Sequence, residues 1–237
     1  MDGKQKAVWI TGASSGIGKA LSYEFAKSGF NVLGTARRIE LLEEIKSELK
    51  EFSNNFHPFQ LDVTGYNSIE KFYNEISKLY QVDCLINNAG MTSFKNAVDN
   101  SIDEIQKIVE TNLLGSIYTI KTVLPDMIEQ CGGTIINILS VVTQKIFTAS
   151  SAYSASKSGL QAYTKVLREE VRDKNIHIIN VSPGATVTPI WSDGVLNKYS
   201  DRMMKPENIA RLILKLYSEK DNFVTEEVVI RPIKGDL

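Results

Sequence analysis

Cysteine and histidine are both scarce in this sequence, with two residues of each among 237. Neither Cys84 nor Cys131 belongs to a Cys-x-x-Cys pair or lies near a histidine at the spacing of metal ligands, so the sequence predicts no metal site. Cys84 lies in the apolar run VDCLI, which indicates a buried strand. This use of cysteine is typical of a reducing compartment.

Long apolar segments and an excess of either charge are missing as well. No run approaches the ~20 apolar residues of a membrane helix, and the first residues, MDGKQKAVWITG, hold no signal-peptide core. Lys and Arg total 27 and Asp and Glu total 28, so the formal net charge is -1. Such balance attracts neither nucleic acid nor an anionic membrane. We therefore expect a cytoplasmic protein without nucleic-acid or membrane partners.

The remaining composition is that of an ordinary globular protein. Hydrophobic residues make up 43% and charged residues 23% of the chain, near the globular average. A chain of this length can bury most of its apolar surface in one core. Because no linker, repeat or low-complexity tract interrupts it, we expect one domain over residues 1–237.

Short, β-branched apolar runs alternate with longer amphipathic stretches. Strands are predicted at residues 7–11, 31–36, 56–63, 82–87, 134–140, 177–182 and 227–231, and helices between them, as at 19–28, 40–52 and 206–219. This alternation indicates an α/β fold: a single Rossmann-type, doubly wound domain with a seven-stranded parallel sheet and helices on both faces. The irregular stretch 183–205 is a candidate substrate loop or lid, or an ordinary surface loop.

A glycine-rich turn, TGASSGIG at residues 11–18, connects the first predicted strand to the first predicted helix. Glycines at such a turn let the backbone approach a pyrophosphate, and the helix N-terminus offers free N–H groups to the phosphates. The turn therefore predicts a dinucleotide site, although glycines also serve as simple chain punctuation. The residues expected to contact the cofactor here are Gly12, Ser14, Ser15, Gly16, Ile17 and Gly18.

The end of the second predicted strand indicates which dinucleotide is bound. About 20 residues beyond the glycines, an NAD site usually carries an acid for the ribose 2′-hydroxyl. This chain instead has Arg37 and Arg38, and no acid appears before Glu40. Two guanidiniums suit a 2′-phosphate, unless they are solvated charges at the start of an exposed helix. We expect NADP(H), with NAD(H) as the alternative, and Arg37 as the better candidate contact.

Tyr153 and Lys157 are four residues apart at the start of a predicted helix and so share a face. A nearby ammonium stabilises a phenolate and brings the pKa of a tyrosine toward neutral, although such pairs are common on exposed helices. Ser140 ends the fifth strand, at the carboxyl edge where such sheets bind ligands. Asn112 stands in a helical stretch where asparagine is a poor helix former, either to hold a water near Lys157 or to face the core.

Taken together, these motifs make the chain similar to the short-chain dehydrogenase/reductase family, in its common branch of about 250 residues, over essentially its full length. The resemblance is carried by TGASSGIG (11–18), NNAG (87–90), the set Asn112, Ser140, Tyr153 and Lys157, and Pro183-Gly184 followed by Thr188. It implies further cofactor contacts at Asp62, Val63, Asn88, Ala89, Gly90, Tyr153, Lys157, Pro183, Gly184, Thr186 and Thr188. It also implies a homodimer or homotetramer.

The resemblance implies an oxidoreductase that interconverts a carbonyl (a ketone, an aldehyde or a 3-oxoacyl group) and an alcohol with NADP(H). Tyr153 would supply the proton to the carbonyl oxygen, and Ser140 would orient that oxygen. Lys157 would lower the pKa of Tyr153 and hold the nicotinamide ribose, and Asn112 would connect Lys157 to solvent through a water. The alternatives are an NAD-dependent 3-hydroxy acid or alcohol dehydrogenase and a protein that senses NADP(H) without turnover, which needs no proton donor.

Several residues flank these motifs without belonging to them. Met91, Thr92, Val142, Phe147 and Trp191 line either the substrate pocket or a core or loop. The chain ends soon after its last predicted strand, which leaves little to cover a large substrate.

Overall fold

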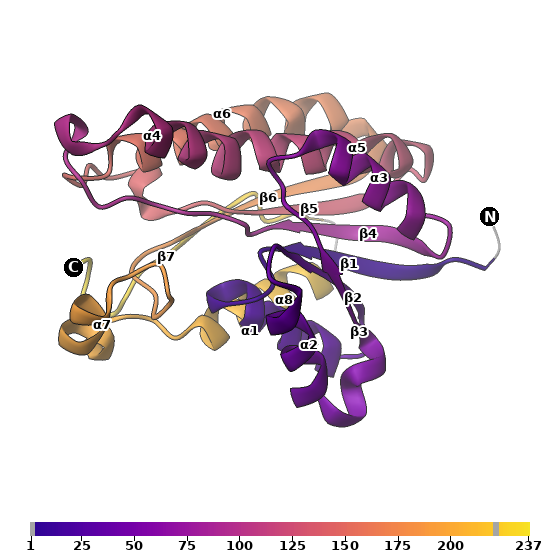
Figure 1. The fold of residues 1–237 in the computed structure, drawn as a ribbon. Coiled ribbons are helices and arrows are strands. Elements are labelled where there is room, and N and C mark those ends of the chain that lie inside the picture. Colours follow the sequence, from indigo (N-terminus) through magenta and orange to yellow (C-terminus); the bar gives the residue numbers. More distant parts are fainter. Residues whose placement is uncertain (1–2, 220–222) are drawn as a thin grey trace.

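Within residues 3–219 and 223–237, which the computed structural model describes, seven parallel strands form one sheet (Figure 1). The strands are β1 (Gln5–Thr11), β2 (Asn31–Ala36), β3 (Phe56–Gln60), β4 (Tyr80–Asn87), β5 (Gly133–Ile138), β6 (Ile176–Pro183) and β7 (Glu227–Ile230). Their order in the sheet is β3-β2-β1-β4-β5-β6-β7. The strand order reverses between β1 and β4, and such a switch point is where ligands bind in open α/β sheets.

Helices cover both faces of the sheet, as predicted (Figure 1). One face carries α1 (Gly16–Lys27), α2 (Ile39–Glu48) and α8 (Pro206–Ser218), and the other carries α3 (Tyr66–Ile76), α4 (Ile102–Val109), α5 (Gly115–Glu129) and α6 (Ser151–Val171). The doubly wound Rossmann-type fold is therefore confirmed. None of the helices in the described part of the chain combines the length and the apolarity that crossing a membrane requires.

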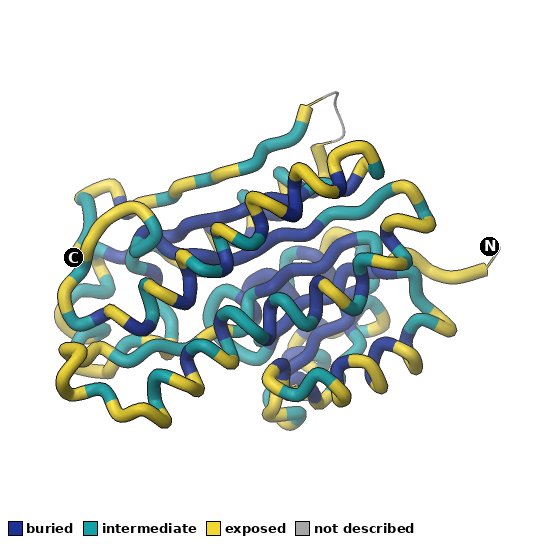
Figure 2. The backbone as a smooth tube through the Cα atoms, turned by 90° about the horizontal axis from the view of Figure 1, so that it is seen from above, coloured by how far each residue is buried: buried dark blue, intermediate teal, exposed yellow. Residues whose placement is uncertain are grey.

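Strand β1 shows why unbroken apolar runs, rather than alternating ones, mark the strands of this sheet. Val8 and Ile10 are buried on the face covered by α1 and α8, whereas Ala7 and Trp9 are buried on the face covered by α3 and α5. A strand covered on both faces must be apolar at every position. Figure 2 shows the result, with buried positions continuous along the central strands.

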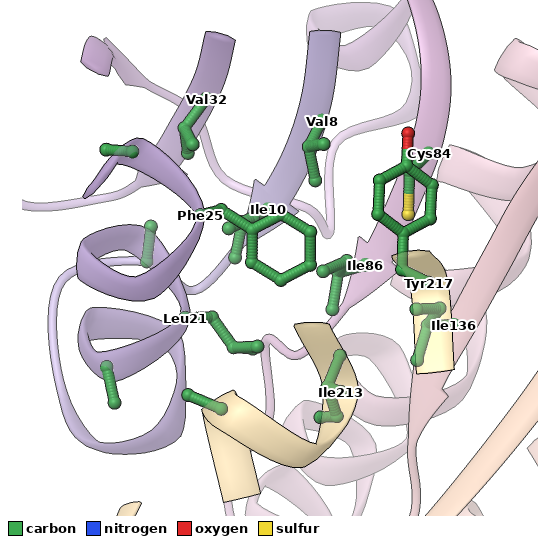
Figure 3. Close-up of a cluster of buried hydrophobic side chains, with 14 of the residues drawn as sticks. Val8, Ile10, Leu21, Phe25, Val32, Cys84, Ile86, Ile136, Ile213 and Tyr217 are labelled. Atoms are coloured by element: carbon green, nitrogen blue, oxygen red, sulfur yellow. The ribbon is translucent and has the colours of Figure 1, made fainter. Parts of the chain in front are cut away.

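The core on the α1 and α8 face is built from side chains of both helices and of the strands beneath them (Figure 3). Phe25 of α1 packs against Tyr217 of α8, with ring centroids 5.7 Å apart. The Tyr217 hydroxyl donates to Asp83 Oδ2 at 2.7 Å, which satisfies the polar end of this ring. Cys84, predicted to lie in a buried strand, is fully buried here.

Some element boundaries differ from the prediction. The amphipathic stretch at 40–52 is α-helical only to Glu48 and continues as a 3₁₀ helix over Lys50–Asn55. The prediction that 183–205 is irregular is wrong at its centre, which holds α7 (Asp193–Tyr199) and a 3₁₀ helix (Ser200–Arg202). Gly194 in the first turn of α7 is a poor helix former, and this obscured the short helix in the sequence.

Candidate active site

A cleft of about 810 Å³ opens beside the point where the strand order reverses. The predicted site residues that line it are Gly12, Ser14, Ser15, Gly16, Ile17, Arg37, Arg38, Asp62, Val63, Asn88, Ala89, Gly90, Ser140, Tyr153, Lys157, Pro183, Gly184, Thr186 and Thr188. Only Gly18 and Asn112, of the predicted residues, are outside this described lining. Segments far apart in the sequence therefore meet in one cleft.

Gly12 and Gly18 show why the turn after β1 requires glycine. Gly12 has a φ of 64°, and a Cβ at this position would lie 2.7 Å from the Cα of Ala89. A Cβ on Gly18 would lie 2.2 Å from the carbonyl oxygen of Gly12. Asn88 joins the two loops, since its Nδ2 donates to the carbonyls of Thr11 and Gly12 at 3.0 Å each. Gly18 thus lies beneath the turn and supports it.

The first turn of α1 presents backbone to the cleft. Ser15 is the N-cap residue, and its side chain makes no capping hydrogen bond, so the first N–H groups of the helix are free for a ligand. A Cβ on Gly16 would lie 3.0 Å from Cγ2 of Thr188. A side chain here would crowd the gap between the turn and the segment after β6. A cradle of this kind fits a pyrophosphate.

Arg37 and Arg38 lie at the adenosine end of the expected cofactor site. Both are exposed at the end of β2, and neither forms an ion pair with a described residue. Asp62, which follows β3, also lines the cleft. Its Oδ1 accepts hydrogen bonds from the backbone N–H and the hydroxyl of Thr64, at 3.0 and 2.9 Å. The two guanidiniums are therefore free to meet a phosphate.

Ser140 and Tyr153 meet where β5 ends and α6 begins. Burial raises the pKa of Tyr153 above its ordinary value, and a hydrogen bond with Ser140 partly opposes this rise. The phenol is therefore protonated at neutral pH. A protonated phenol hydrogen-bonded to a serine hydroxyl can deliver a proton to an oxygen placed between them.

Lys157 is buried beside this pair, with 4% of its surface exposed. Its Nζ donates to the carbonyl oxygen of Ile138 at 2.6 Å and lies 6.0 Å from the centroid of the Tyr153 ring. Burial lowers the pKa of Lys157 to about 8. Because the pKa of Tyr153 is raised in this structure, its expected lowering by Lys157 stays a prediction for the complex with cofactor.

Asn112 lies behind the cleft, in a π-helical turn (Glu110–Leu114) between α4 and α5. Its Oδ1 accepts from the Met91 N–H at 2.8 Å, and its Nδ2 donates to the Met91 carbonyl at 2.8 Å and to Ser156 Oγ at 3.0 Å. The side chain thus fixes the loop after β4 to α6. Its link to Lys157 through a water stays a prediction.

The structure also places residues that carried no assigned role in the sequence. Met91, Thr92, Val142, Phe147 and Trp191 all line the cleft, and so do Phe94, Ile190, Asp236 and Leu237. The end of the chain, which is expected to leave little to cover a large substrate, contributes these last two residues to the lining. Asp236 forms ion pairs with Lys145 and Arg231. Because Lys145 is far from Asp236 in the sequence, no local pattern predicts their contact.

A row of buried asparagines crosses the sheet next to the cleft. Asn87, Asn137 and Asn180 occupy paired positions on β4, β5 and β6. Asn87 Nδ2 donates to Asn137 Oδ1 at 3.0 Å, and Asn137 Nδ2 donates to Asn180 Oδ1 at 3.1 Å. At the ends, Thr119 donates to Asn87 Oδ1 at 2.6 Å and Asn180 Nδ2 donates to Glu227 Oε1 at 3.0 Å. The row holds Asn87 beside residues 88–90, which line the cleft.

Known proteins resemble this chain in sequence and in fold. A family model described as short chain dehydrogenase matches residues 6–197. The chain is 31% identical over 236 residues to sepiapterin reductase of Chlorobaculum tepidum, covering 96% of both chains. It is 32% identical over 247 residues to NADP-dependent 3-hydroxy acid dehydrogenase of Schizosaccharomyces pombe, covering 98% of this chain and 93% of that one. A solved structure, the closed form of serine dehydrogenase complexed with NADP⁺, matches with a TM-score of 0.91 at 25% identity, covering 98% and 96%.

Proposed function

The chain belongs to the short-chain dehydrogenase family, and on that premise we propose that it is an NADP(H)-dependent oxidoreductase interconverting a carbonyl and the corresponding alcohol. One observation carries the proposal. Ser140, Tyr153 and Lys157 converge at one end of a cleft whose other end holds the glycine turn and Arg37. This arrangement supports the proposal that a proton donor and a dinucleotide share the cleft.

Residues of the cleft fit a dinucleotide along its length. The free N–H groups at the start of α1 would bind the pyrophosphate. Arg37, with Arg38 beside it, would grip the 2′-phosphate that distinguishes NADP from NAD. Thr188, next to Gly16, would bind the carboxamide of the nicotinamide. When bound, the cofactor supplies or accepts the hydride.

Tyr153 acts on the substrate oxygen. In the reductive direction its hydroxyl donates a proton to the carbonyl oxygen as negative charge grows there. Ser140 donates a second hydrogen bond to the same oxygen and fixes its position. In the oxidative direction Tyr153 accepts the proton of the alcohol. The raised pKa of Tyr153 keeps the phenol protonated before the reaction, and a lowering of this pKa by Lys157 in the complex would make the phenol a better proton donor.

Lys157 would act on both the cofactor and Tyr153. An ammonium has three donors, and one of them is used on the carbonyl oxygen of Ile138. The others would hold the ribose hydroxyls of the cofactor, and the positive charge would lower the pKa of Tyr153 in the complex. Asn112 positions the loop at Met91 that borders the same end of the cleft.

The first test is a titration of the protein with NADPH and with NADH, followed by tryptophan fluorescence, since Trp191 lines the cleft. We expect tight binding of NADPH and weak binding of NADH, followed by NADPH oxidation on addition of ketones or aldehydes. Calorimetry serves as the control for a silent fluorophore. Binding of neither dinucleotide contradicts the proposal, and a preference for NADH points to the NAD-dependent dehydrogenase instead.

The family resemblance also bears on the domain organisation, location and oligomeric state of the protein. We propose that residues 1–237 form one domain that acts in the cytoplasm as a homodimer or homotetramer on a small-molecule substrate. The helices around Asn112 and Tyr153 would pair across a two-fold axis. Light scattering coupled to gel filtration tests this, and a monomer at micromolar concentration contradicts it.

A further inference from the structure

The cleft has two chemically different ends, and the strand order separates them. Arg37 and Arg38 follow β2, whereas Ser140 follows β5 and Pro183 ends β6. In the order β3-β2-β1-β4-β5-β6-β7, β2 and β5 are three strand spacings apart, or about 14 Å. The catalytic end, meaning the part of the cleft around Ser140 and Tyr153, therefore lies beyond the reach of both arginines.

Large apolar side chains lie in the wall at the catalytic end, together with the hydroxyl side chains of Thr92, Thr148 and Ser150. The apolar side chains include Met91, Phe94, Val142, Phe147, Ile190 and Trp191. Phe94 and Trp191 stack in parallel, with ring centroids 4.6 Å apart and an interplanar angle of 8°. Trp191 Nε1 donates to the carbonyl of Thr186 at 3.0 Å, which fixes its ring, and 49% of Phe94 is exposed. The stack thus offers a flat, fixed aromatic surface to a ligand.

The charged side chains in the described lining of the catalytic end are those of Lys157 and Asp236. Lys157 is buried and bonded to Ile138. Asp236 Oδ2 forms ion pairs with Lys145 at 3.1 Å and Arg231 at 3.0 Å, and its Oδ1 is buried without a hydrogen-bond partner among the described residues. Because Lys145 and Arg231 do not belong to this described lining, a carboxylate on a substrate would meet Asp236 rather than a free cation.

Asp236 is anchored to several segments. Lys145 follows β5, Arg231 follows β7, and Arg202, which follows α7, donates to the Asp236 carbonyl at 3.2 Å. Figure 1 accordingly shows the C-terminal end beside α7. A carboxylate held in this way cannot turn aside to admit a second anion, and like charges in contact disfavour binding.

We propose, on the premise of the proposed function, that the non-reacting part of the substrate is uncharged and carries a ring or another flat apolar group that packs on Phe94 and Trp191. Burial of such a group and ring stacking favour binding. A carboxylate at the same place would lose its hydration and gain no unpaired cation, because Lys145 and Arg231 already pair with Asp236. The substrates are therefore neutral ketones or aldehydes of this kind rather than 3-hydroxy acids or their oxo forms.

The test compares two alcohols that differ only where the inference applies. In 1-phenylethanol the carbinol carbon carries a methyl group, and in mandelate it carries a carboxylate. We expect the NADP⁺-saturated protein to bind 1-phenylethanol at least about tenfold more tightly in calorimetry. Equal or tighter binding of mandelate overturns the inference, and so does binding of neither alcohol.

Two variants separate the effect of the Asp236 charge from that of the Phe94 ring. Asp236→Asn removes the charge and should tighten mandelate binding severalfold without changing that of 1-phenylethanol, whereas Asp173→Asn, in an exposed pair with Lys174, should change neither. Phe94→Leu should weaken 1-phenylethanol binding about 2- to 12-fold, whereas Phe223→Leu, at an exposed phenylalanine, should not. An unchanged preference in both cleft variants contradicts the assignment of these residues.

Turnover distinguishes this inference from the proposed function. Faster NADPH-dependent reduction of acetophenone than of phenylglyoxylate supports both. Preferred reduction of phenylglyoxylate contradicts the inference alone. Tight binding of 1-phenylethanol without hydride transfer to any carbonyl contradicts the proposed function alone.

Discussion

Lys157 Nζ and the carbonyl oxygen of Ile138 lie 2.6 Å apart, at the point where β5 ends. This hydrogen bond ties the ammonium to the strand that leads into Ser140. The side chain is thereby held in one place before any cofactor arrives. The electrostatic effect that we propose for Lys157 on Tyr153 would therefore be preorganised by the fold.

The burial of Lys157 predicts a pH dependence. Its pKa is lowered to about 8, so the ammonium of the free protein loses its proton as the pH rises through about 8. We expect kcat/KM for NADPH, which reports the free enzyme, to decline over that window in carbonyl reduction. Lys157→Arg keeps the cation and should move the decline upward. A flat profile from pH 7 to 9 in the unmodified protein contradicts this role.

The lowered pKa of Lys157 also predicts how the free energy of unfolding changes with pH. Unfolded Lys157 titrates near the ordinary 10.5, above its folded value of about 8. Between these values the unfolded state binds more protons, so the contribution of Lys157 to the free energy of unfolding rises with pH. This contribution is absent from Lys157→Met, and urea unfolding at pH 8 and pH 10 in both proteins measures the difference.

Replacement of Tyr153 by phenylalanine removes the proposed proton donor and little else. We expect kcat to fall about 10²- to 10⁴-fold, while the Kd for NADPH stays within a factor of a few. Tyr163→Phe, on the same helix and packed against the core, is the matched control and should keep most activity. Near-normal turnover by Tyr153→Phe removes the assignment.

Arg37→Asp tests the choice of dinucleotide. The substitution removes a guanidinium from the expected 2′-phosphate site and adds an acid that suits a 2′-hydroxyl. We expect the Kd for NADPH to rise about 10- to 100-fold, as for a lost charge-assisted hydrogen bond, and that for NADH to change less or to fall. Arg211→Asp, on α8, should leave both unchanged. Equal losses for the two dinucleotides contradict the role of Arg37.

Asn137→Ala tests the buried asparagine row. The amides of Asn87 and Asn180 each lose a partner, and unsatisfied buried polar groups cost about 1–3 kcal/mol. We expect the free energy of unfolding in urea to fall by about that amount. Asn74→Ala, at an exposed position on α3, should stay within about 0.5 kcal/mol of the unmodified protein. Similar losses in the two variants contradict a special cost for the row.

The sequence predicted the sheet well because strands such as β1 hold unbroken apolar runs, here Ala7 to Ile10. It also predicted residues that line one cleft, since Ser140 follows a strand, Tyr153 and Lys157 lie at the start of a helix, and the topology brings both to one edge of the sheet. It missed Asp236, because ion pairs between distant segments leave no local pattern. It also missed the hydrogen-bond partners of Lys157 and Asn112. These partners are backbone atoms of Ile138 and Met91, which any residue at those positions would provide.

The asparagine row has a consequence for how this sequence can change. Side chains alternate between the two faces of a strand, so a one-residue slip of β4, β5 or β6 would turn an amide away from its neighbours. Asn87, Asn137 and Asn180 therefore encode the alignment of three strands jointly. A single replacement leaves buried amides without partners and lowers the free energy of unfolding. A joint replacement by apolar residues of similar volume removes these amides and so avoids the loss. Relatives that lack one of these asparagines are expected to lack the others.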